Sequence, residues 1–240
     1  MRILLAAPTS KAKHYCKDAW LNHLNKLTYH SFDVLIVDNT PGEEYYLEEF
    51  CGKGFKAIHV EPEGTVVEYI TESQNAMLKY FRDHPIYDAL FILESDVFPP
   101  YNVIEYLMHF DKPVITFPYF INYRDNHPAI CLQNMEKTYV QRQTVLADGL
   151  NTFNDWNGEL KQVFASGIGC TLIKREVFDY VKEFRCKTDG RETLKDSSVF
   201  SDTFFYRDLN KEGIPAYITT DGIAQHNWSD WNEHKDFINN

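Results

Sequence analysis

Short apolar runs alternate along the chain with longer amphipathic stretches. The apolar runs are nearly continuous, which is typical of strands that are buried on both faces. They predict strands at 2–10, 32–40, 56–62, 88–96 and 113–120. Apolar residues at helical spacing predict helices at 14–28, 43–50, 65–83 and 101–110. This alternation predicts an α/β fold with a mostly parallel central sheet flanked by helices.

The second half of the chain has a less regular pattern. Residues 121–163 are rich in Asn, Asp, Gln and Thr and have poor periodicity, which predicts a long loop or a small hairpin insertion. A second polar loop is expected at 186–198, and loops of this length often act as lids. Between them, 163–184 predicts a strand and then a helix, while 201–220 predicts a helix, a glycine turn and a strand. We therefore expect a single domain over 1–240.

The length and charge of the chain restrict the classes of function that it can have. A chain of 240 residues with 44% hydrophobic and 25% charged residues is long enough for a large buried core and has an ordinary soluble composition. Its formal net charge of −11 disfavours general binding of nucleic acid, which requires a basic surface. A phosphate-bearing ligand would therefore be bound through a metal ion rather than through a basic patch.

Cysteine usage and hydropathy bear on the compartment. The five cysteines are odd in number, widely spaced and without a C-x-x-C pair, which indicates free thiols in a reducing compartment. The apolar run at the N-terminus is too short for a signal peptide, and no apolar stretch of the length of a transmembrane segment occurs. We expect a cytoplasmic protein, with peripheral attachment to a membrane left open.

Candidate chemistry lies where the predicted strands end, because ligands of such sheets bind at the carboxyl ends of the strands. The polar residues there are Thr9, Asp38, Glu94 and Asp96. Glycine-rich phosphate loops are missing, which disfavours dinucleotide and P-loop enzymes. Glu94 and Asp96 alternate on a strand and so face the same side, where they could hold Mg²⁺ or Mn²⁺ on a diphosphate. The alternative is that Asp96 caps the next turn.

Several segments resemble, in order, motifs of GT-A glycosyltransferases, and specifically of the large inverting family called family 2. They are the first strand together with "VLIVDNT" (34–40), "SQNAML" (73–78), "ESD" (94–96), "GIGCTLIKREVFD" (167–179), "SDTFFYRDLNKEGIPAYI" (201–218) and "QHNW" (225–228). The resemblance covers about residues 2–228. The chain departs from the family at three positions: Gln74 stands where Arg is usual, Glu94 replaces the first Asp of the D-x-D motif, and Ser201 replaces a Glu.

This resemblance implies a Rossmann-like GT-A fold with a nucleotide-binding half (1–100) and an acceptor-binding half (101–240). It implies a metal-dependent, non-processive transferase that uses a UDP- or GDP-sugar, with inversion expected. Asp202 matches the catalytic base of the family. The other implied residues are the metal ligands Glu94, Asp96 and His226, the donor contacts Thr9, Asp38, Asn75 and Ser95, and the acceptor-side residue Gly167.

Each candidate also has a structural alternative. Asp38 could cap the following turn, and Ser201 or Asp202 could cap a helix. Asn75 and His226 could be surface residues. Trp156 lies in a polar segment, where it could stack on an acceptor sugar or anchor a minor core. Lys11 and His14 are best explained as a solvated helix start, and Trp228 and Trp231 as packing of the tail.

Two other classes of protein remain as alternatives. A sugar-phosphate nucleotidyltransferase would need a Gly-rich, Arg-containing loop after the first strand, and "APTSKAKHY" has neither feature. A non-catalytic nucleotide- or sugar-binding protein would need no acid at position 202. A processive polysaccharide synthase is disfavoured because its Q-x-x-R-W motif and membrane helices are missing. The acceptor could be a carbohydrate, a lipid, a protein or a modified nucleobase.

Overall fold

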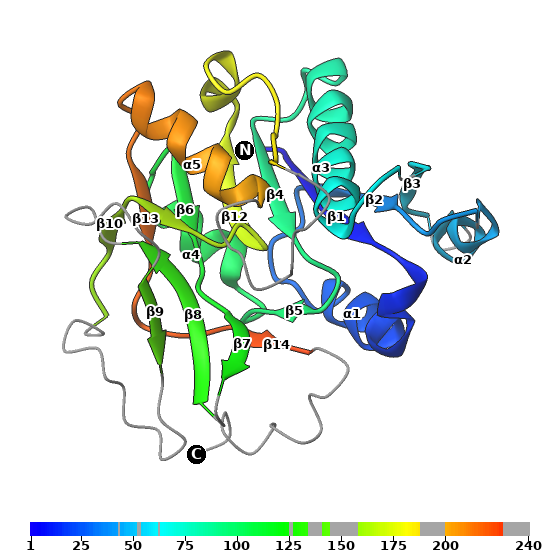
Figure 1. The fold of residues 1–240 in the computed structure, drawn as a ribbon, viewed down its shortest axis with the longest axis horizontal. Coiled ribbons are helices and arrows are strands. Elements are labelled where there is room, and N and C mark those ends of the chain that lie inside the picture. Colours follow the sequence, from blue (N-terminus) through cyan, green and yellow to red (C-terminus); the bar gives the residue numbers. More distant parts are fainter. Residues whose placement is uncertain are drawn as a thin grey trace.

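The computed structural model describes residues 1–42, 44–51, 54–61, 63–124, 127–133, 141–144, 158–187 and 200–227. These residues form one central sheet of eight strands with helices on both faces, which confirms the predicted α/β architecture (Figure 1). In spatial order the strands are β10 (Lys161–Val163), β13 (Ala216–Ile218), β6 (Val114–Thr116), β12 (Cys170–Lys174), β4 (Ala89–Leu93), β1 (Ile3–Thr9), β2 (Phe32–Asp38) and β3 (Lys56–His59).

The direction of the strands changes across the sheet. Strands β3, β2, β1 and β4 run parallel, as their continuous apolar sequences predict, and β6 is parallel to β13. Strand β12 lies antiparallel between β4 and β6, and β10 is antiparallel to β13. The chain reaches β12 from strands of a second sheet rather than through a crossover helix, so no crossover forces β12 into the parallel direction.

Helices cover both faces of the central sheet, and alternate residues of its strands supply both cores. In β1, Leu4 and Ala6 belong to one core, while Ile3, Leu5 and Ala7 belong to the other. The first core is covered by α3 (Val66–Asp83), α5 (Ser201–Lys211) and the 3-10 helix η3 (Arg175–Asp179). The second is covered by α1 (Lys17–Leu24), the 3-10 helix η2 (Glu44–Leu47), α2 (Glu48–Cys51) and α4 (Val103–His109).

A second, antiparallel sheet is built mainly from the polar region that follows β6. Its order is β11 (Ala165–Ser166), β8 (His127–Gln133) and β7 (Phe120–Arg124), with β9 (Gln141–Thr144) paired to β8. The small hairpin expected within 121–163 is therefore present as β7 and β8. Of the second expected polar loop, only residues 186–187 are described.

Several expected boundaries shift. The helix predicted at 14–28 begins as the 3-10 helix η1 (Lys11–Cys16) and ends with α1 at Leu24. The helix expected before residue 184 is the short 3-10 helix η3.

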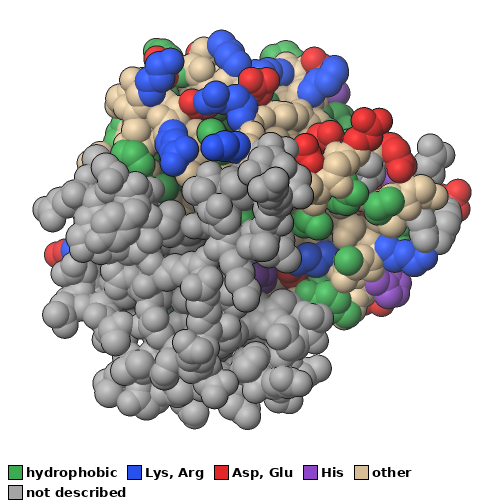
Figure 2. Space-filling model, viewed as in Figure 1, with side chains coloured by type: hydrophobic (Ala, Val, Ile, Leu, Met, Phe, Trp, Pro, Cys, Tyr) green, Lys and Arg blue, Asp and Glu red, His purple; other side chains and the backbone are tan. Residues whose placement is uncertain are grey.

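Within the described ranges, no helix is long and apolar enough to cross a membrane. On the face shown in Figure 2, Lys and Arg side chains are mixed with Asp and Glu among the coloured residues.

The strands of the two predicted halves lie at opposite ends of the strand order in the central sheet. Strands β1 to β4 come from residues 1–100, whereas β6, β10, β12 and β13 come from residues 101–240. The assignment of nucleotide and acceptor binding to these halves stays a prediction.

Candidate active site

The chain turns sharply at the carboxyl end of β4. The N–H of Glu94 donates to the Gly169 carbonyl at 2.8 Å, which holds the strand end against the neighbouring segment. The N–H of Val97 donates to the Glu94 carbonyl at 3.0 Å and closes a tight turn. This turn explains the sequence in which an apolar strand runs directly into two carboxylates: the strand body is core, and the acids stand at its edge.

A short antiparallel pair brings His226 to the same place. Strand β14 (Gln225–His226) pairs with β5 (Val97–Phe98), which follows the turn. The N–H of Asn227 also donates to the Asp96 carbonyl at 2.6 Å. Backbone hydrogen bonds therefore fix His226 beside Asp96, although the two residues are far apart in the sequence.

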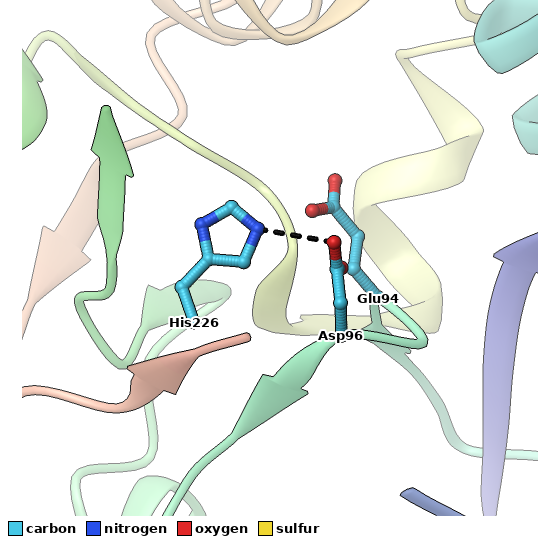
Figure 3. A group of neighbouring side chains, drawn as sticks. All are labelled: Glu94, Asp96 and His226. Atoms are coloured by element: carbon cyan, nitrogen blue, oxygen red, sulfur yellow. Dashed lines mark hydrogen bonds and ion pairs between the residues drawn. The ribbon is translucent and has the colours of Figure 1, made fainter. Parts of the chain in front are cut away.

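Glu94, Asp96 and His226 converge on one point (Figure 3). Each offers a ligand atom, and these atoms lie within 4.8 Å of one another. The Nε2 atom of His226 lies 3.2 Å from Oδ2 of Asp96. Asp96 is 1% exposed, and its second oxygen, Oδ1, has no hydrogen-bond partner among the described residues.

Two carboxylates, Glu94 and Asp96, lie close together in the cluster, and the positive charges of nearby side chains compensate them. Burial and repulsion from Asp96 raise the pKa of Glu94. Burial would also raise the pKa of Asp96, but His226 and Lys13 lower it to about 2. Burial is the largest influence on His226 and disfavours its charged imidazole, but attraction to Asp96, the hydrogen bond to Asp96 and the charge of Glu94 together raise its pKa. The cluster therefore requires positive charge at the Asp96 carboxylate.

These residues fit a divalent cation. Two carboxylates and one imidazole are a suitable donor set for Mn²⁺, and the oxygen ligands alone would also suit Mg²⁺. A buried carboxylate oxygen without a partner is costly, so the unpartnered Oδ1 of Asp96 itself indicates a missing ligand. Glu94, Asp96 and His226 are the residues that would hold the ion.

Tyr119 and two glycines brace this cluster. The ring of Tyr119 meets that of His226 edge to face, with centroids 5.5 Å apart, and its hydroxyl accepts the N–H of Gly169 at 2.9 Å. A Cβ on Gly169 would lie 2.6 Å from both the Glu94 carboxyl carbon and the Tyr119 hydroxyl, and one on Gly167 would lie 2.6 Å from that hydroxyl. Gly167 was expected on the acceptor side; in the structure its lack of a side chain makes room for Tyr119.

A cavity of about 360 Å³ opens beside the acids. Its volume falls within the range of small-molecule sites. Its lining includes the polar residues Thr9, Ser10, Lys13, Glu94, Ser95 and Asp96 and the apolar residues Pro41, Val66, Tyr69 and Ile70.

Two of the predicted donor contacts, Thr9 and Ser95, line this cavity, as do Glu94 and Asp96. The Ser95 hydroxyl is buried and has no partner among the described residues. Asn39 joins β1 to α3 beside the cavity. Its N–H donates to the Thr9 carbonyl at 2.9 Å, and its side-chain amide donates to the hydroxyl of Ser73 on α3 at 3.0 Å.

Asp38 is fully buried at the end of β2. Its Oδ1 atom accepts the N–H of Thr40 at 3.1 Å and the Thr40 hydroxyl at 2.6 Å. Its Oδ2 atom lies 3.0 Å from Nδ1 of His59. These contacts match the turn-capping alternative, and Asp38 is not among the described residues that line the cavity. Recognition of a base by Asp38 stays a prediction.

Asn75 performs a structural task. Its side-chain Nδ2 donates to the Phe184 carbonyl at 2.9 Å, and its Oδ1 accepts the Phe184 N–H at 2.8 Å. This two-way bond ties α3 to the chain that follows η3, and it leaves Asn75 outside the described lining of the cavity. The expected donor contact of Asn75 stays a prediction, while its side-chain amide is engaged by the Phe184 backbone.

Asp202 lies in the first turn of α5, where the Thr203 N–H donates to its Oδ1 at 2.7 Å. The helix begins after Phe200, which makes no side-chain cap, so neither Ser201 nor Asp202 is the N-cap residue. Burial raises the pKa of Asp202 to about 7, and the charge of Glu94 contributes to the increase. Asp202 therefore stands close enough to the cluster to sense its charge.

Lys13 was missed by the sequence reasoning, which considered only its neighbours Lys11 and His14. Lys13 lines the cavity, and its ammonium group pairs with Oδ2 of Asp96. Its position directly after the first strand is the signal that could have found it. Trp156, the proposed acceptor platform, lies outside the described residues.

Comparison with known proteins supports the assignment of the fold. No protein-family model and no curated protein sequence matches the chain. Among solved structures, S. aureus TarS 1-349 matches with a TM-score of 0.55 at 14% identity, over 98% of this chain and 63% of TarS 1-349. A TarS 1-349 complex with UDP matches with a TM-score of 0.55 at 14% identity, over 99% of this chain and 64% of that one.

The mannosyltransferase PcManGT from Pyrobaculum calidifontis, in complex with GDP-Man and Mn²⁺, matches with a TM-score of 0.54 at 12% identity. That alignment covers 94% of this chain and 56% of PcManGT, so the chain spans less than two thirds of the length of each of these neighbours. At such identities the likeness defines the fold. The chain has the GT-A glycosyltransferase fold.

Proposed function

We propose that this protein is a metal-dependent, non-processive glycosyltransferase. It moves a sugar from a nucleoside-diphosphate sugar to an acceptor hydroxyl, with inversion at the anomeric carbon. The observation that carries this proposal is the Glu94, Asp96 and His226 cluster, whose two acids line a cavity that also has apolar walls. A nucleoside diphosphate likewise combines a charged part with a largely apolar part.

The cavity gives each part of the donor a place. The base and ribose lie against the apolar residues Val66, Tyr69 and Ile70. The diphosphate lies beside Asp96 and the Lys13 ammonium group. UDP or GDP is the expected nucleotide, since the neighbouring structures carry UDP and GDP-Man.

The net charge of the chain requires a cation at the diphosphate. With a formal charge of −11, the protein repels a dianionic ligand unless positive charge is placed locally. Glu94, Asp96 and His226 would hold Mn²⁺ or Mg²⁺ there. Such an ion acts as a Lewis acid that stabilises the negative charge on the departing nucleoside diphosphate.

Asp202 is the proposed general base. Its carboxylate takes the proton from the acceptor hydroxyl while that oxygen bonds to the anomeric carbon, and the bond from this carbon to the diphosphate oxygen breaks on the opposite side. A pKa of about 7 suits a base that must exchange protons near neutral pH. The acceptor is expected to be a carbohydrate, a lipid, a protein or a modified nucleobase.

A panel of nucleotide-sugars tests the proposal. Thermal unfolding is measured with UDP- and GDP-sugars, each with Mn²⁺ and with EDTA, because a ligand that binds only the folded state raises the melting temperature. We expect one nucleotide class to stabilise the protein only when Mn²⁺ is present. Slow hydrolysis of the same donor, followed without an acceptor, separates an enzyme from a non-catalytic binding protein. A protein stabilised by none of the nucleotides would contradict the proposal.

A further inference from the structure

The Lys13 side chain occupies the position at which the cluster meets the cavity. Its ammonium group pairs with Oδ2 of Asp96, the same oxygen that faces Nε2 of His226. The Lys13 side chain is 38% exposed, so it reaches the buried acid from the open side of the cavity. Among the described residues that line this cavity, Lys13 is the sole Lys or Arg.

The backbone of Lys13 is anchored, and its side chain lines the cavity. The Lys13 N–H donates to the Ser10 carbonyl at 2.9 Å. The buried Cys16 sulfur lies 3.2 Å from the Lys13 carbonyl and 3.3 Å from the Ser95 carbonyl, which joins η1 to the turn that carries the acids. A lysine stem is long and flexible, so the ammonium group can leave Asp96 without any movement of this backbone.

Two cations compete for one carboxylate. A divalent ion held by Asp96 would lie beside the ammonium group of Lys13, and the two like charges would repel each other. A diphosphate bound in the cavity removes this conflict because its oxygens offer Lys13 another anionic partner. Metal and nucleotide should therefore each favour the binding of the other.

We propose that Lys13 couples metal binding to nucleotide binding. In the ligand-free protein its ammonium group neutralises Asp96 and lowers the affinity for the divalent ion. When a nucleoside diphosphate enters, Lys13 moves from Asp96 to a diphosphate oxygen and frees Asp96 for the ion. This inference rests on the proposed function. It adds that the ion binds tightly only together with the nucleotide.

Calorimetric titration of Mn²⁺, with and without UDP, tests the coupling, and a parallel series uses GDP. For the wild type we expect the nucleotide to raise the Mn²⁺ affinity about tenfold or more, a usual size for coupling between sites. In Lys13→Met, Mn²⁺ alone should bind more tightly than in the wild type, and the effect of the nucleotide should be reduced by about threefold or more; the part that remains comes from direct attraction between the ion and the diphosphate. Lys13→Arg keeps the charge and should keep most of the coupling.

Lys17→Met is the matched control. Lys17 lies four positions further along, pairs with Glu49 and does not belong to the described lining of the cavity, so this variant loses the same charge without touching Asp96. It should titrate like the wild type. Lys13→Gln replaces Lys13→Met if the latter fails to give a wild-type circular dichroism spectrum.

The outcomes separate this inference from the proposed function. If the wild type binds neither Mn²⁺ nor UDP or GDP, both are overturned. If the wild type binds both ligands, but neutralising Lys13 leaves the affinity for Mn²⁺ alone unchanged or weaker, only the role of Lys13 is overturned. Tighter binding of Mn²⁺ to the neutral variant, with reduced coupling, supports it.

Discussion

The Nε2 atom of His226 lies 3.2 Å from Oδ2 of Asp96, although the two residues are 130 positions apart in the sequence. The pairing of β14 with β5 creates this contact through backbone hydrogen bonds. It completes a cluster that two neighbouring acids could not form alone.

Removing the metal ligands should affect affinity unequally. Asp96→Ala removes the buried carboxylate at the centre of the cluster and should weaken Mn²⁺ binding about 100-fold or more, whereas Glu94→Ala should cost about tenfold. Calorimetry in the presence of UDP or GDP measures both. Asp83→Ala, which removes an exposed acid paired with Lys79, is the control and should change nothing. Equal nucleotide affinity in Mn²⁺ and in EDTA would exclude a metal-bridged donor.

Asp202→Asn tests the general base. The amide keeps the size of the side chain but cannot accept the proton, so sugar transfer should fall by about 10²–10⁴-fold while donor affinity stays close to that of the wild type. Asp208→Asn, on the same helix and paired with Arg185, is the control. Full activity of Asp202→Asn would reject the assignment. Retention of the anomeric configuration, observed by proton NMR of the product, would also leave Asp202 without this role.

The raised pKa of Asp202 predicts a pH dependence of stability. With a folded pKa of about 7 against an ordinary 3.8, the folded protein keeps a proton that the unfolded chain releases between these values. The contribution of Asp202 to the free energy of unfolding is therefore intact below about pH 3.8 and is lost as the pH rises to about 7. In EDTA, Asp202→Asn should match the wild type near pH 4 and be more stable at pH 8. Parallel stability curves would contradict this expectation.

Gly169→Ala should disturb the cluster sterically. The new Cβ would lie 2.6 Å from the Glu94 carboxyl carbon and from the Tyr119 hydroxyl, so both side chains must move. We expect a lower melting temperature and at least about tenfold weaker Mn²⁺ binding. Gly213→Ala is the control because its φ of +69° makes Ala strained, although its Cβ would meet nothing within 4 Å. It should cost about 1 kcal/mol of stability and leave Mn²⁺ affinity unchanged.

Asn75→Ala should reduce stability without affecting the donor. The variant loses both hydrogen bonds to the Phe184 backbone and leaves buried groups unpaired, which costs about 1–3 kcal/mol. Denaturant unfolding measures this loss. Lys79→Ala, which breaks an exposed pair on the same helix, should change stability by less than about 1 kcal/mol. If Asn75→Ala weakens nucleotide binding at unchanged stability, the donor contact implied by the family resemblance is supported instead.

The sequence alone determined the α/β class and the edge of the sheet at which the acidic cluster lies. Continuous apolar runs such as 34–37 are typical of strands buried on both faces, and this pattern can be recognised locally in the sequence. The pair Glu94 and Asp96 was visible for the same reason, because charged groups directly after a buried strand must lie at its end. The direction of β12 could not be predicted, because the sequence of a buried strand has the same apolar pattern whether the strand runs parallel or antiparallel to its neighbours.

Only the tertiary structure decided which polar side chains are available for a ligand. Asp38 and Asn75 matched family motifs, yet their hydrogen-bonding groups are engaged by Thr40, His59 and Phe184. Lys13 matched no motif and proved to contact Asp96. Hydrogen bonds and ion pairs of this kind join residues that are distant in the chain, and their partners are set by how the strands and helices pack. The sequence specifies the type of each side chain, whereas the tertiary structure determines which residue that side chain contacts.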